Sequence, residues 1–250
     1  MTLEEMLDAV GDAYGDLGGW WPADSPFEVA VGAFLVQAVT WRQASQAVTA
    51  LMRAGLLTPA ALAGAYHGDV AALIRPALYH QQKARYLQRF AGFVRDELGG
   101  DILTLRTVPS AEQEKLLRRL PGIGQETAAA IMAYALGQAV PVLDAYALRI
   151  LPRIGAIGEG DARDGVREAM TRAIGGDART ARLLHAAIVE LGRLHCRPEP
   201  LCASCPLTAR CPKVLGHPAD GRRDRPASNA GRAASHREAG DAGRDRAAPT

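Results

Sequence analysis

The chain has 250 residues, of which 48% are hydrophobic and only 5% aromatic, and its formal net charge is +2. This length suits one large domain or two small ones, and the sequence shows no secretory signal and no apolar run that could span a bilayer, so we expect a soluble cytoplasmic protein. The 29 basic and 27 acidic side chains nearly cancel, so charge neither requires nor excludes nucleic acid, and any DNA site has to be a local basic patch.

Helical periodicity dominates the sequence, whereas alternating β-branched runs are few, and this pattern predicts an all-α fold. Start signals support several of the helices: Ser25-Pro26 begins one, and Thr40 with Gln43 forms a capping box before the next. In chain order we expect helices over residues 2–17, 27–38, 40–54, 58–66, 69–74, 79–98, 110–119, 125–136, 145–154, 161–174 and 178–194, with a further turn at 101–105.

The composition changes near the C-terminal end. From Gly216 onward Gly, Ala, Arg, Asp, Pro and Ser predominate and apolar periodicity is lost, so this segment cannot bury enough surface to offset its ordering entropy. We therefore expect residues 214–250 to form a disordered tail. The preceding residues, 1–213, carry 22 basic and 22 acidic side chains and should be neutral as a whole.

A turn with two closely spaced glycines precedes the helix expected at 125–136. It runs from Leu120 to Gly124 with the sequence LPGIG, and glycines let the backbone adopt positive φ and approach another molecule closely. The N–H groups at the start of the following helix form a concavity that suits a phosphate. An ordinary helix-to-helix connection has the same pattern, but Asp144, just beyond the helix, adds a carboxylate that can cap the next one.

All four cysteines lie between Cys196 and Cys211, with the spacing Cys-x5-Cys-x2-Cys-x5-Cys. Four thiols in one short stretch of a chain without an export signal favour a metal site over disulfides. Zinc is one alternative, but structural zinc sites usually bring their ligands as two close pairs, and only one Cys-x2-Cys pair is present. The wider outer spacings suit a larger, cube-shaped cluster. The expected ligands are Cys196, Cys202, Cys205 and Cys211.

The hairpin followed by Asp144 resembles the helix-hairpin-helix (HhH-GPD) DNA glycosylase superfamily, whose members remove damaged bases from DNA, and the resemblance covers most of residues 18–213. The cysteine loop is similar to the [4Fe–4S] loop of endonuclease III relatives, although its first interval has five residues where that family usually has six. The resemblance implies two helical lobes with a DNA cleft between them. Residues 20–135 would form the helix-hairpin-helix lobe, and residues 1–19 with 136–213 the iron–sulfur lobe.

Several matches favour the 3-methyladenine DNA glycosylase III branch of this superfamily. Trp20-Trp21-Pro22, the segment 37–41, the segment 74–84 and Glu126 are similar to that branch. In endonuclease III a lysine stands where this chain has Glu126, and a carboxylate cannot form the imine that an AP lyase requires. We therefore expect a monofunctional base-excision-repair hydrolase for alkylated bases, with AP lyase activity weak or absent.

The same resemblance implies roles for individual residues. Asp144 would stabilise the positive charge that develops on the sugar, or activate water, while it caps its helix. Trp20, Trp21 and Trp41 would stack on a flipped cationic base with Glu126 opposite its charge, although core packing is the alternative for each tryptophan. Gln37 would fill the gap in the duplex that the flipped base leaves. The expected phosphate contacts are Gly122, Ile123, Gly124 and Thr127.

Two other functions stay open at this point. One is an endonuclease III-type glycosylase/AP lyase for oxidised pyrimidines, which nicking of abasic DNA would support. The other is a non-catalytic module that binds distorted duplex, which base release would exclude. In the preferred function the partner is double-stranded DNA with a damaged base, and the enzyme is a nucleoid-associated monomer without membrane contact.

Overall fold

The computed structural model describes residues 1–158 and 163–215. Every assigned element in these ranges is helical, which confirms the predicted all-α fold. The expected disordered tail lies outside the described residues from 216 onward, and its first two residues belong to the last helix. The elements are α1 (Leu3–Tyr14), α2 (Pro26–Leu35), α3 (Trp41–Arg53), α4 (Pro59–Gly64), α5 (His67–Leu73), α6 (His80–Glu97), η1 (Ile102–Thr107), α7 (Ser110–Arg118), α8 (Gln125–Ala130), η2 (Ile131–Ala135), α9 (Ala145–Arg153), α10 (Arg163–Ile174), α11 (Ala178–Leu194), η3 (Cys202–Ser204) and α12 (Pro212–Leu215).

Most helices begin and end close to the expected positions, because local signals set their ends. The capping box between Thr40 and Gln43 is present at the start of α3, as predicted. Helix α1 ends at Tyr14, earlier than expected, because Gly15 adopts a positive φ of 78° and its N–H bonds to the Gly11 carbonyl.

The helix expected at residues 125–136 is not a continuous α-helix. Helix α8 ends at Ala130, and the next five residues, Ile131–Ala135, form the π-helical segment η2. The sequence does not predict this change from α-helix to π-helix, because the Ala, Ile and Met residues here fit an α-helix well. Such π turns are rare and often lie at functional sites, and this one carries Tyr134.

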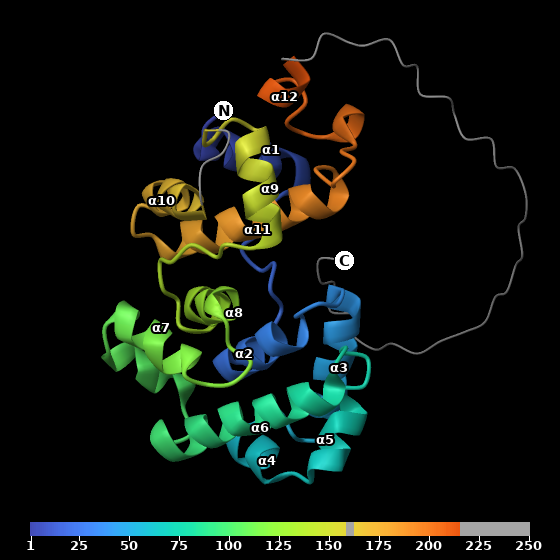
Figure 1. Cartoon of the computed structure of the whole chain (residues 1–250), viewed down its shortest axis with the longest axis vertical. Helices are drawn as coiled ribbons and strands as arrows, with labels where there is room; N and C mark the ends of the chain where they lie inside the picture. Colours follow the sequence, from blue (N-terminus) through green and yellow to red (C-terminus); the bar gives the residue numbers. More distant parts are fainter. Residues whose placement is uncertain (159–162, 216–250) are drawn as a thin grey trace, which may run out of the picture.

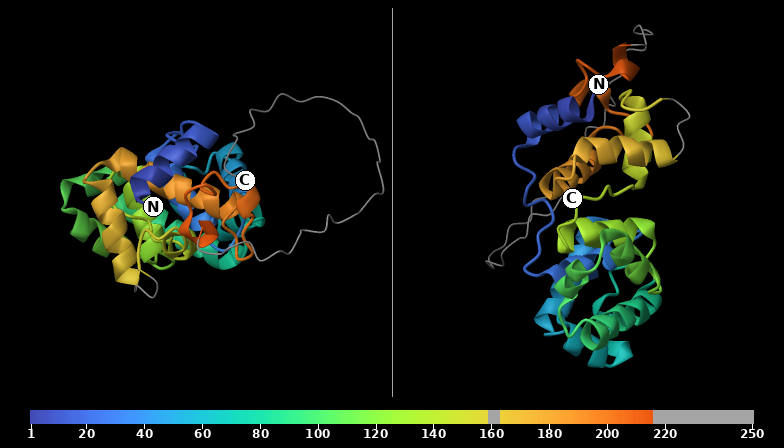
Figure 2. Two further views of the ribbon diagram at one scale, coloured as in Figure 1. Left: turned by 90° about the horizontal axis from the view of Figure 1, so that it is seen from above. Right: turned by 90° about the vertical axis from the view of Figure 1, so that its left-hand side faces the viewer.

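Two hydrophobic clusters form the cores of two lobes, which Figures 1 and 2 show stacked one on the other. Helix α2 runs through the first lobe, and every residue from Phe27 to Leu35 is buried. Helix α11 packs against α1, α9 and α10 in the second. Val142 belongs to the first cluster and Leu143 to the second, so the chain passes between cores there. The lobe boundaries expected at residues 19/20 and 135/136 stay predictions.

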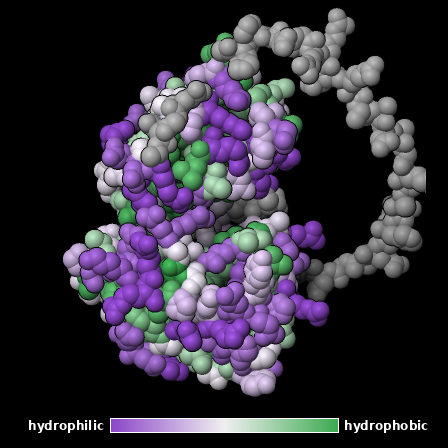
Figure 3. Space-filling view, viewed as in Figure 1, coloured by the Kyte–Doolittle hydropathy of each residue, from purple (hydrophilic) through white to green (hydrophobic). Residues whose placement is uncertain are grey.

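The molecule narrows where the lobes meet, as the space-filling view shows (Figure 3). The segments that join α1 to α2 and η2 to α9 cross this waist. One of these joining segments carries Trp20 and Trp21, and the other leads to Asp144. Within residues 1–158 and 163–215, no helix combines the length and apolar character needed to cross a membrane.

Candidate functional site

Asp144 lies between the lobes as the N-cap of α9. Its Oδ1 accepts the N–H of Ala147 at 2.7 Å, which satisfies a donor of the first helical turn and confirms the expected cap. The residue is 7% exposed, and its Oδ2 lies 3.6 Å from His185 Nε2. Asp144 is thus buried beside polar groups rather than in hydrocarbon, where an ionised carboxylate would be strongly disfavoured.

A second carboxyl group, that of Glu126, feels the charge of Asp144. Glu126 stands in the first turn of α8 and its side chain is exposed to solvent. Partial loss of hydration raises the pKa of Glu126, and the negative charge of Asp144 raises it further, whereas His185 and Arg163 oppose the rise. A carboxyl group whose pKa is raised by burial and by a second carboxyl group is typical of acid–base sites, so Glu126 and Asp144 mark the centre of the candidate site.

The three predicted tryptophans belong to one aromatic cluster with Tyr134 and His185. Trp21 is central, with its ring centroid 5.0 Å from Tyr134, 5.4 Å from Trp41 and 6.3 Å from Trp20. Trp20 in turn lies 5.6 Å from His185, the residue that contacts Asp144. The fold therefore brings Trp20, Trp21 and Trp41 into one cluster, and Trp20 is the member that reaches His185 beside Asp144.

The tryptophans pack edge to face. Trp20 and Trp21 meet at 72°, and Trp21 and Trp41 meet at 78°. Trp20 is also fixed by its indole N–H, which donates to Glu190 Oε1 at 2.8 Å. A planar base can enter between these rings only after one of them rotates, so the sandwich stays a prediction.

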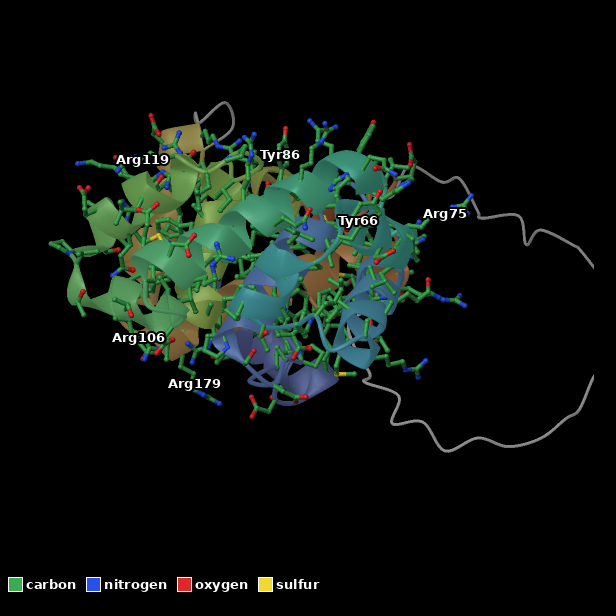
Figure 4. All side chains as sticks on the ribbon, turned by 90° about the horizontal axis from the view of Figure 1, so that it is seen from below. Tyr66, Arg75, Tyr86, Arg106, Arg119 and Arg179 are labelled. Atoms are coloured by element: carbon green, nitrogen blue, oxygen red, sulfur yellow. The ribbon has the colours of Figure 1, made fainter. Side chains whose placement is uncertain are left out.

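The two hairpin glycines differ in their surroundings. Gly122 has a φ of +87°, and a Cβ added there would overlap the ring of Tyr86, whereas the space beside Gly124 is open. Ile123 is buried, and its N–H bonds to the Leu120 carbonyl. Gly124 and the first turn of α8 are therefore the accessible part of the hairpin for a phosphate. Figure 4 shows Tyr86 and, along the same edge of the lobe, Arg119 at the end of α7.

Gln37 follows α2 and reaches the hairpin. Its Nε2 donates to the Gly122 carbonyl at 3.0 Å and to Thr127 Oγ1 at 2.8 Å. Buried Lys83 donates to the carbonyls of Leu35 at 3.0 Å and Gln37 at 2.7 Å, and burial lowers the pKa of Lys83 to about 8. Gln37 is thus bonded to the hairpin and to Thr127. To enter a gap in DNA, Gln37 would have to break its hydrogen bonds to the Gly122 carbonyl and to Thr127.

Sequence reasoning left several site residues without a role. His185 lies on a largely apolar face of α11, where a histidine is often a core residue, Tyr134 stands in an apolar stretch, and Lys83 stands in a polar stretch of α6 that suits a solvated lysine. Leu78 and Tyr79 are exposed at the start of α6, and Tyr79 has a left-handed φ of 58°. A bulky residue in that conformation is uncommon, which marks this turn as a further candidate contact.

The four cysteines line one apolar pocket between α9, the end of α11 and the loop that follows. In the described part of the chain, no three His, Cys, Asp or Glu side chains converge closely enough to hold a single metal ion. Zinc would bring its sulfurs to about 3.8 Å from one another, because each Zn–S bond is about 2.3 Å long. A larger cluster would hold the four sulfurs further apart around the same pocket. The residues concerned are Cys196, Cys202, Cys205 and Cys211.

Comparison with known proteins decides the family. Residues 31–175, more than half of the chain, match the HhH-GPD superfamily of base excision DNA repair proteins. The chain belongs to this superfamily. The predicted family is therefore confirmed, and the protein is a DNA glycosylase with endonuclease III-like relatives.

Individual relatives agree with the assignment. The chain is 32% identical over 205 residues to a protein of Methanocaldococcus jannaschii described as a DNA repair glycosylase, covering 80% of the chain and 91% of that protein. It is 30% identical over 204 residues to thymine-DNA glycosylase of Aeropyrum pernix, covering 79% and 87%.

Solved structures share the fold of this HhH-GPD glycosylase. Endonuclease III in a non-covalent complex with DNA matches with a TM-score of 0.71 at 23% identity, covering 86% of the chain and 98% of that structure. The 3-methyladenine DNA glycosylase of H. pylori bound to 1,N6-ethenoadenine matches with a TM-score of 0.61 at 22% identity, covering 77% and 98%. These likenesses confirm the two-lobed helix-hairpin-helix fold.

Proposed function

We propose that this glycosylase removes alkylated, 3-methyladenine-type bases from double-stranded DNA by hydrolysis, as a nucleoid-associated monomer with little or no AP lyase activity. The observation that carries the proposal is the carboxyl pair of Asp144 and Glu126, which His185 joins to a cluster of three tryptophans through Trp20. This arrangement supplies negative charge and aromatic faces where an alkylated nucleotide carries positive charge.

The reaction breaks the C1′–N bond of the damaged nucleotide, and the bonding electron pair leaves with the base. Positive charge then develops on the sugar, and the carboxylate of Asp144 stabilises it. Oδ1 of Asp144 is held by the Ala147 N–H, so Oδ2 is the oxygen that faces the sugar in this proposal. Water adds to C1′ and gives up a proton, which a carboxylate of the pair can accept.

Alkylated bases suit this site for a physical reason. An N-alkylated purine is positively charged and its glycosidic bond is already weakened, so it leaves without being protonated. A cation over an aromatic face gains about 0.5–2 kcal/mol, and an ionised Glu126 adds to the attraction. The base has to leave the stack to reach the pocket. Trp21 is the indole that we expect to rotate, because Trp20 is held by Glu190.

The positions of the three lysines of the chain support the proposed lack of lyase chemistry. Lys83 is buried under the end of α2, Lys115 pairs with Glu112 on the surface of α7, and Lys213 lies on α12 beside the cysteine loop. At the hairpin position that a lyase fills with an amine, this chain has Glu126. A Schiff base with the sugar is therefore not expected.

We also propose that Cys196, Cys202, Cys205 and Cys211 hold a [4Fe–4S] cluster, which would join the loop to the second lobe because ligation fixes four points of a short segment. The surrounding residues support the loop independently of the cluster. Arg149 donates to the Cys196 carbonyl at 2.8 Å, and Arg153 donates to the carbonyls of Arg197 and Pro198. The cluster loop is thereby tied to α9, the helix that Asp144 caps.

A second candidate substrate is a mismatched thymine or uracil. The similarity to the thymine-DNA glycosylase of Aeropyrum pernix, over 79% of this chain, favours it. Thymine is a neutral leaving group, so its release would benefit from a proton donor, and a Glu126 with a raised pKa is suited to that role. Release of an alkylated base thus uses an ionised Glu126, whereas release of thymine or uracil uses a protonated Glu126.

The test is a panel of duplexes that each carry one lesion: an alkylated purine, thymine opposite guanine, uracil opposite guanine, or an oxidised pyrimidine. We expect base release mainly from the alkylated purine, complete loss of release in Asp144→Asn, and retained binding by that variant. Release mainly from the mismatches would favour the second candidate. Release of none of the bases would show a non-catalytic module.

Borohydride trapping tests the absence of lyase activity in the same assay. Reduction of a Schiff base gives a stable covalent protein–DNA adduct. We expect no adduct with the wild-type protein, and we expect intact abasic strands. An adduct at a level comparable with substrate turnover would contradict the monofunctional mechanism.

A further inference from the structure

We propose that His185 is a positioning residue for Asp144, holding the carboxylate through Nε2 while Tyr134 holds the imidazole through Nδ1. The inference rests on the proposed hydrolysis at Asp144. His185 is 6% exposed and lies on α11, Tyr134 comes from η2, and Asp144 begins α9. Elements of both lobes therefore meet at one imidazole.

The hydrogen bonds of Tyr134 fix the tautomer of His185. The Tyr134 hydroxyl lies 3.1 Å from the Arg182 carbonyl and 2.8 Å from His185 Nδ1. The hydroxyl has one proton, and a carbonyl oxygen can only accept, so the hydroxyl donates to Arg182. His185 Nδ1 must then carry a proton and donate it to the Tyr134 oxygen, which leaves Nε2 as the atom that faces Asp144.

The ring itself is held in place by its neighbours. The Trp20 and Tyr134 rings meet His185 edge to face, at centroid distances of 5.6 Å and 5.5 Å. Nε2 lies 3.6 Å from Asp144 Oδ2, slightly beyond hydrogen-bond length. A proton on Nε2 would make this contact attractive and shorten it, while a bare Nε2 would set two acceptors against each other.

Charged groups of both signs surround the imidazole. Asp144 and Glu126 are both negative when ionised, and they act on His185 from α9 and α8. The cations nearby are Arg163 on α10, which donates to the Leu143 carbonyl at 3.1 Å, and Arg182 on α11. An imidazolium between two carboxyl groups would neutralise part of their mutual repulsion.

His185 would act on the reaction by orienting the carboxylate of Asp144. The Ala147 N–H holds Oδ1, and in this proposal a bond from His185 to Oδ2, now 3.6 Å away, fixes the plane of the Asp144 carboxylate. Without His185 the carboxylate could rotate about its Cβ–Cγ bond and turn Oδ2 away from the sugar. Displacing a catalytic group by about 1 Å can cost roughly 100-fold in rate, which is the size of effect expected here.

Two substitutions test the roles of the two imidazole nitrogens of His185 separately. The amide of His185→Asn reaches about as far as Nδ1, so it keeps the Tyr134 contact and loses that to Asp144. The amide of His185→Gln reaches about as far as Nε2 and restores a donor for Asp144. With methylated duplex DNA under single-turnover conditions, we expect release to slow by roughly 100-fold in the Asn variant, to recover in the Gln variant, and binding to an abasic-site analogue to change little.

His67→Asn is the matched control, because His67 bonds to Gln88 and Gln81 in the first lobe and should leave the rate unchanged. Release by His185→Asn at the wild-type rate would overturn the inference. Equal slowing in the Asn and Gln variants, together with a lower unfolding temperature, would also overturn it, since that result describes a purely structural residue.

Nitrogen-15 NMR of the imidazole decides the contact without any substrate. We expect a protonated Nδ1 in His185, and an Nε2 signal that shifts when Asp144→Asn removes the charge. An unchanged Nε2 signal would overturn the inference. A wild type that releases no base from any lesion would instead overturn the proposed function, and the NMR result would still decide whether His185 holds Asp144.

Discussion

Trp20 donates its indole N–H to Glu190 Oε1 at 2.8 Å, and this bond joins residues 170 positions apart in the chain. Glu190 is 6% exposed on α11, and its other oxygen accepts from Arg193 at 2.7 Å. The bond therefore connects the aromatic cluster beside Asp144 to the helix that leads into the cysteine loop. It also fixes the Trp20 indole.

Removing this acceptor should destabilise the protein. In Glu190→Ala the Trp20 N–H and the Arg193 guanidinium lose a buried acceptor, and we expect the free energy of unfolding to fall by about 3 kcal/mol. Glu168→Ala is the control, because Glu168 and its partner Arg172 are 72% and 74% exposed, and such pairs contribute about 0–1 kcal/mol. Urea titrations of both variants measure the difference, and equal stability would show that the Glu190 bond is not a structural link.

The hairpin glycines should respond differently to alanine. Gly122→Ala forces a positive φ on a side chain and pushes against Tyr86, so we expect a loss of about 1–2 kcal/mol of stability or more. Gly124→Ala meets open space and should leave stability unchanged, but its methyl group would obstruct a phosphate at the backbone. Denaturation and DNA-binding anisotropy separate the two effects. Wild-type affinity in Gly124→Ala would place the phosphate elsewhere.

Lys83 gives a test that depends on pH. Its pKa is lowered by burial to about 8 from 10.5, so between these values the unfolded chain binds the proton that the folded chain has released. Stability should therefore rise with pH above about 8, and this contribution should disappear as pH falls through 8. Lys83→Met should lack the rise, whereas Lys115→Met, which changes an exposed lysine, should keep it. Urea titrations between pH 7 and pH 10 compare the variants.

The same substitution should affect DNA recognition. In Lys83→Met the carbonyls of Leu35 and Gln37 lose their donor, so the segment that carries Gln37 should become less ordered. We expect weaker binding to a lesion duplex in Lys83→Met and wild-type binding in Lys115→Met. A Lys83→Met protein that binds the lesion as tightly as the wild type would show that Gln37 does not need this support.

The cysteine loop predicts a specific metal content. Anaerobically purified protein should contain about four iron and four sulfide per chain and no stoichiometric zinc. Cys205→Ser should lose the iron and destabilise the second lobe, since Leu207, two residues further on, is buried in that core. Elemental analysis and visible absorption provide the measurement. One zinc per chain, with no sulfide, would overturn the cluster.

Local structure was predictable where a few neighbouring residues decide it. Thr40 and Gln43 form their capping box, and Asp144 caps α9, because cap hydrogen bonds span only three residues. Gly15 ends α1 for an equally local reason, although the predicted end was three residues too late. The π-helical turn at Ile131–Ala135 was missed because its residues favour an α-helix.

By itself, the sequence determined the helices, the hairpin, the cap at Asp144 and the membership of a glycosylase superfamily, since all of these rest on short patterns along the chain. Only the tertiary structure decided that Tyr134 and His185 belong to the site, that Trp20 is fixed by Glu190, and that Gln37 bonds to the hairpin. Those contacts join residues dozens to more than a hundred positions apart. The packing of the two lobes determines which of these residues meet, and no short pattern along the chain predicts it.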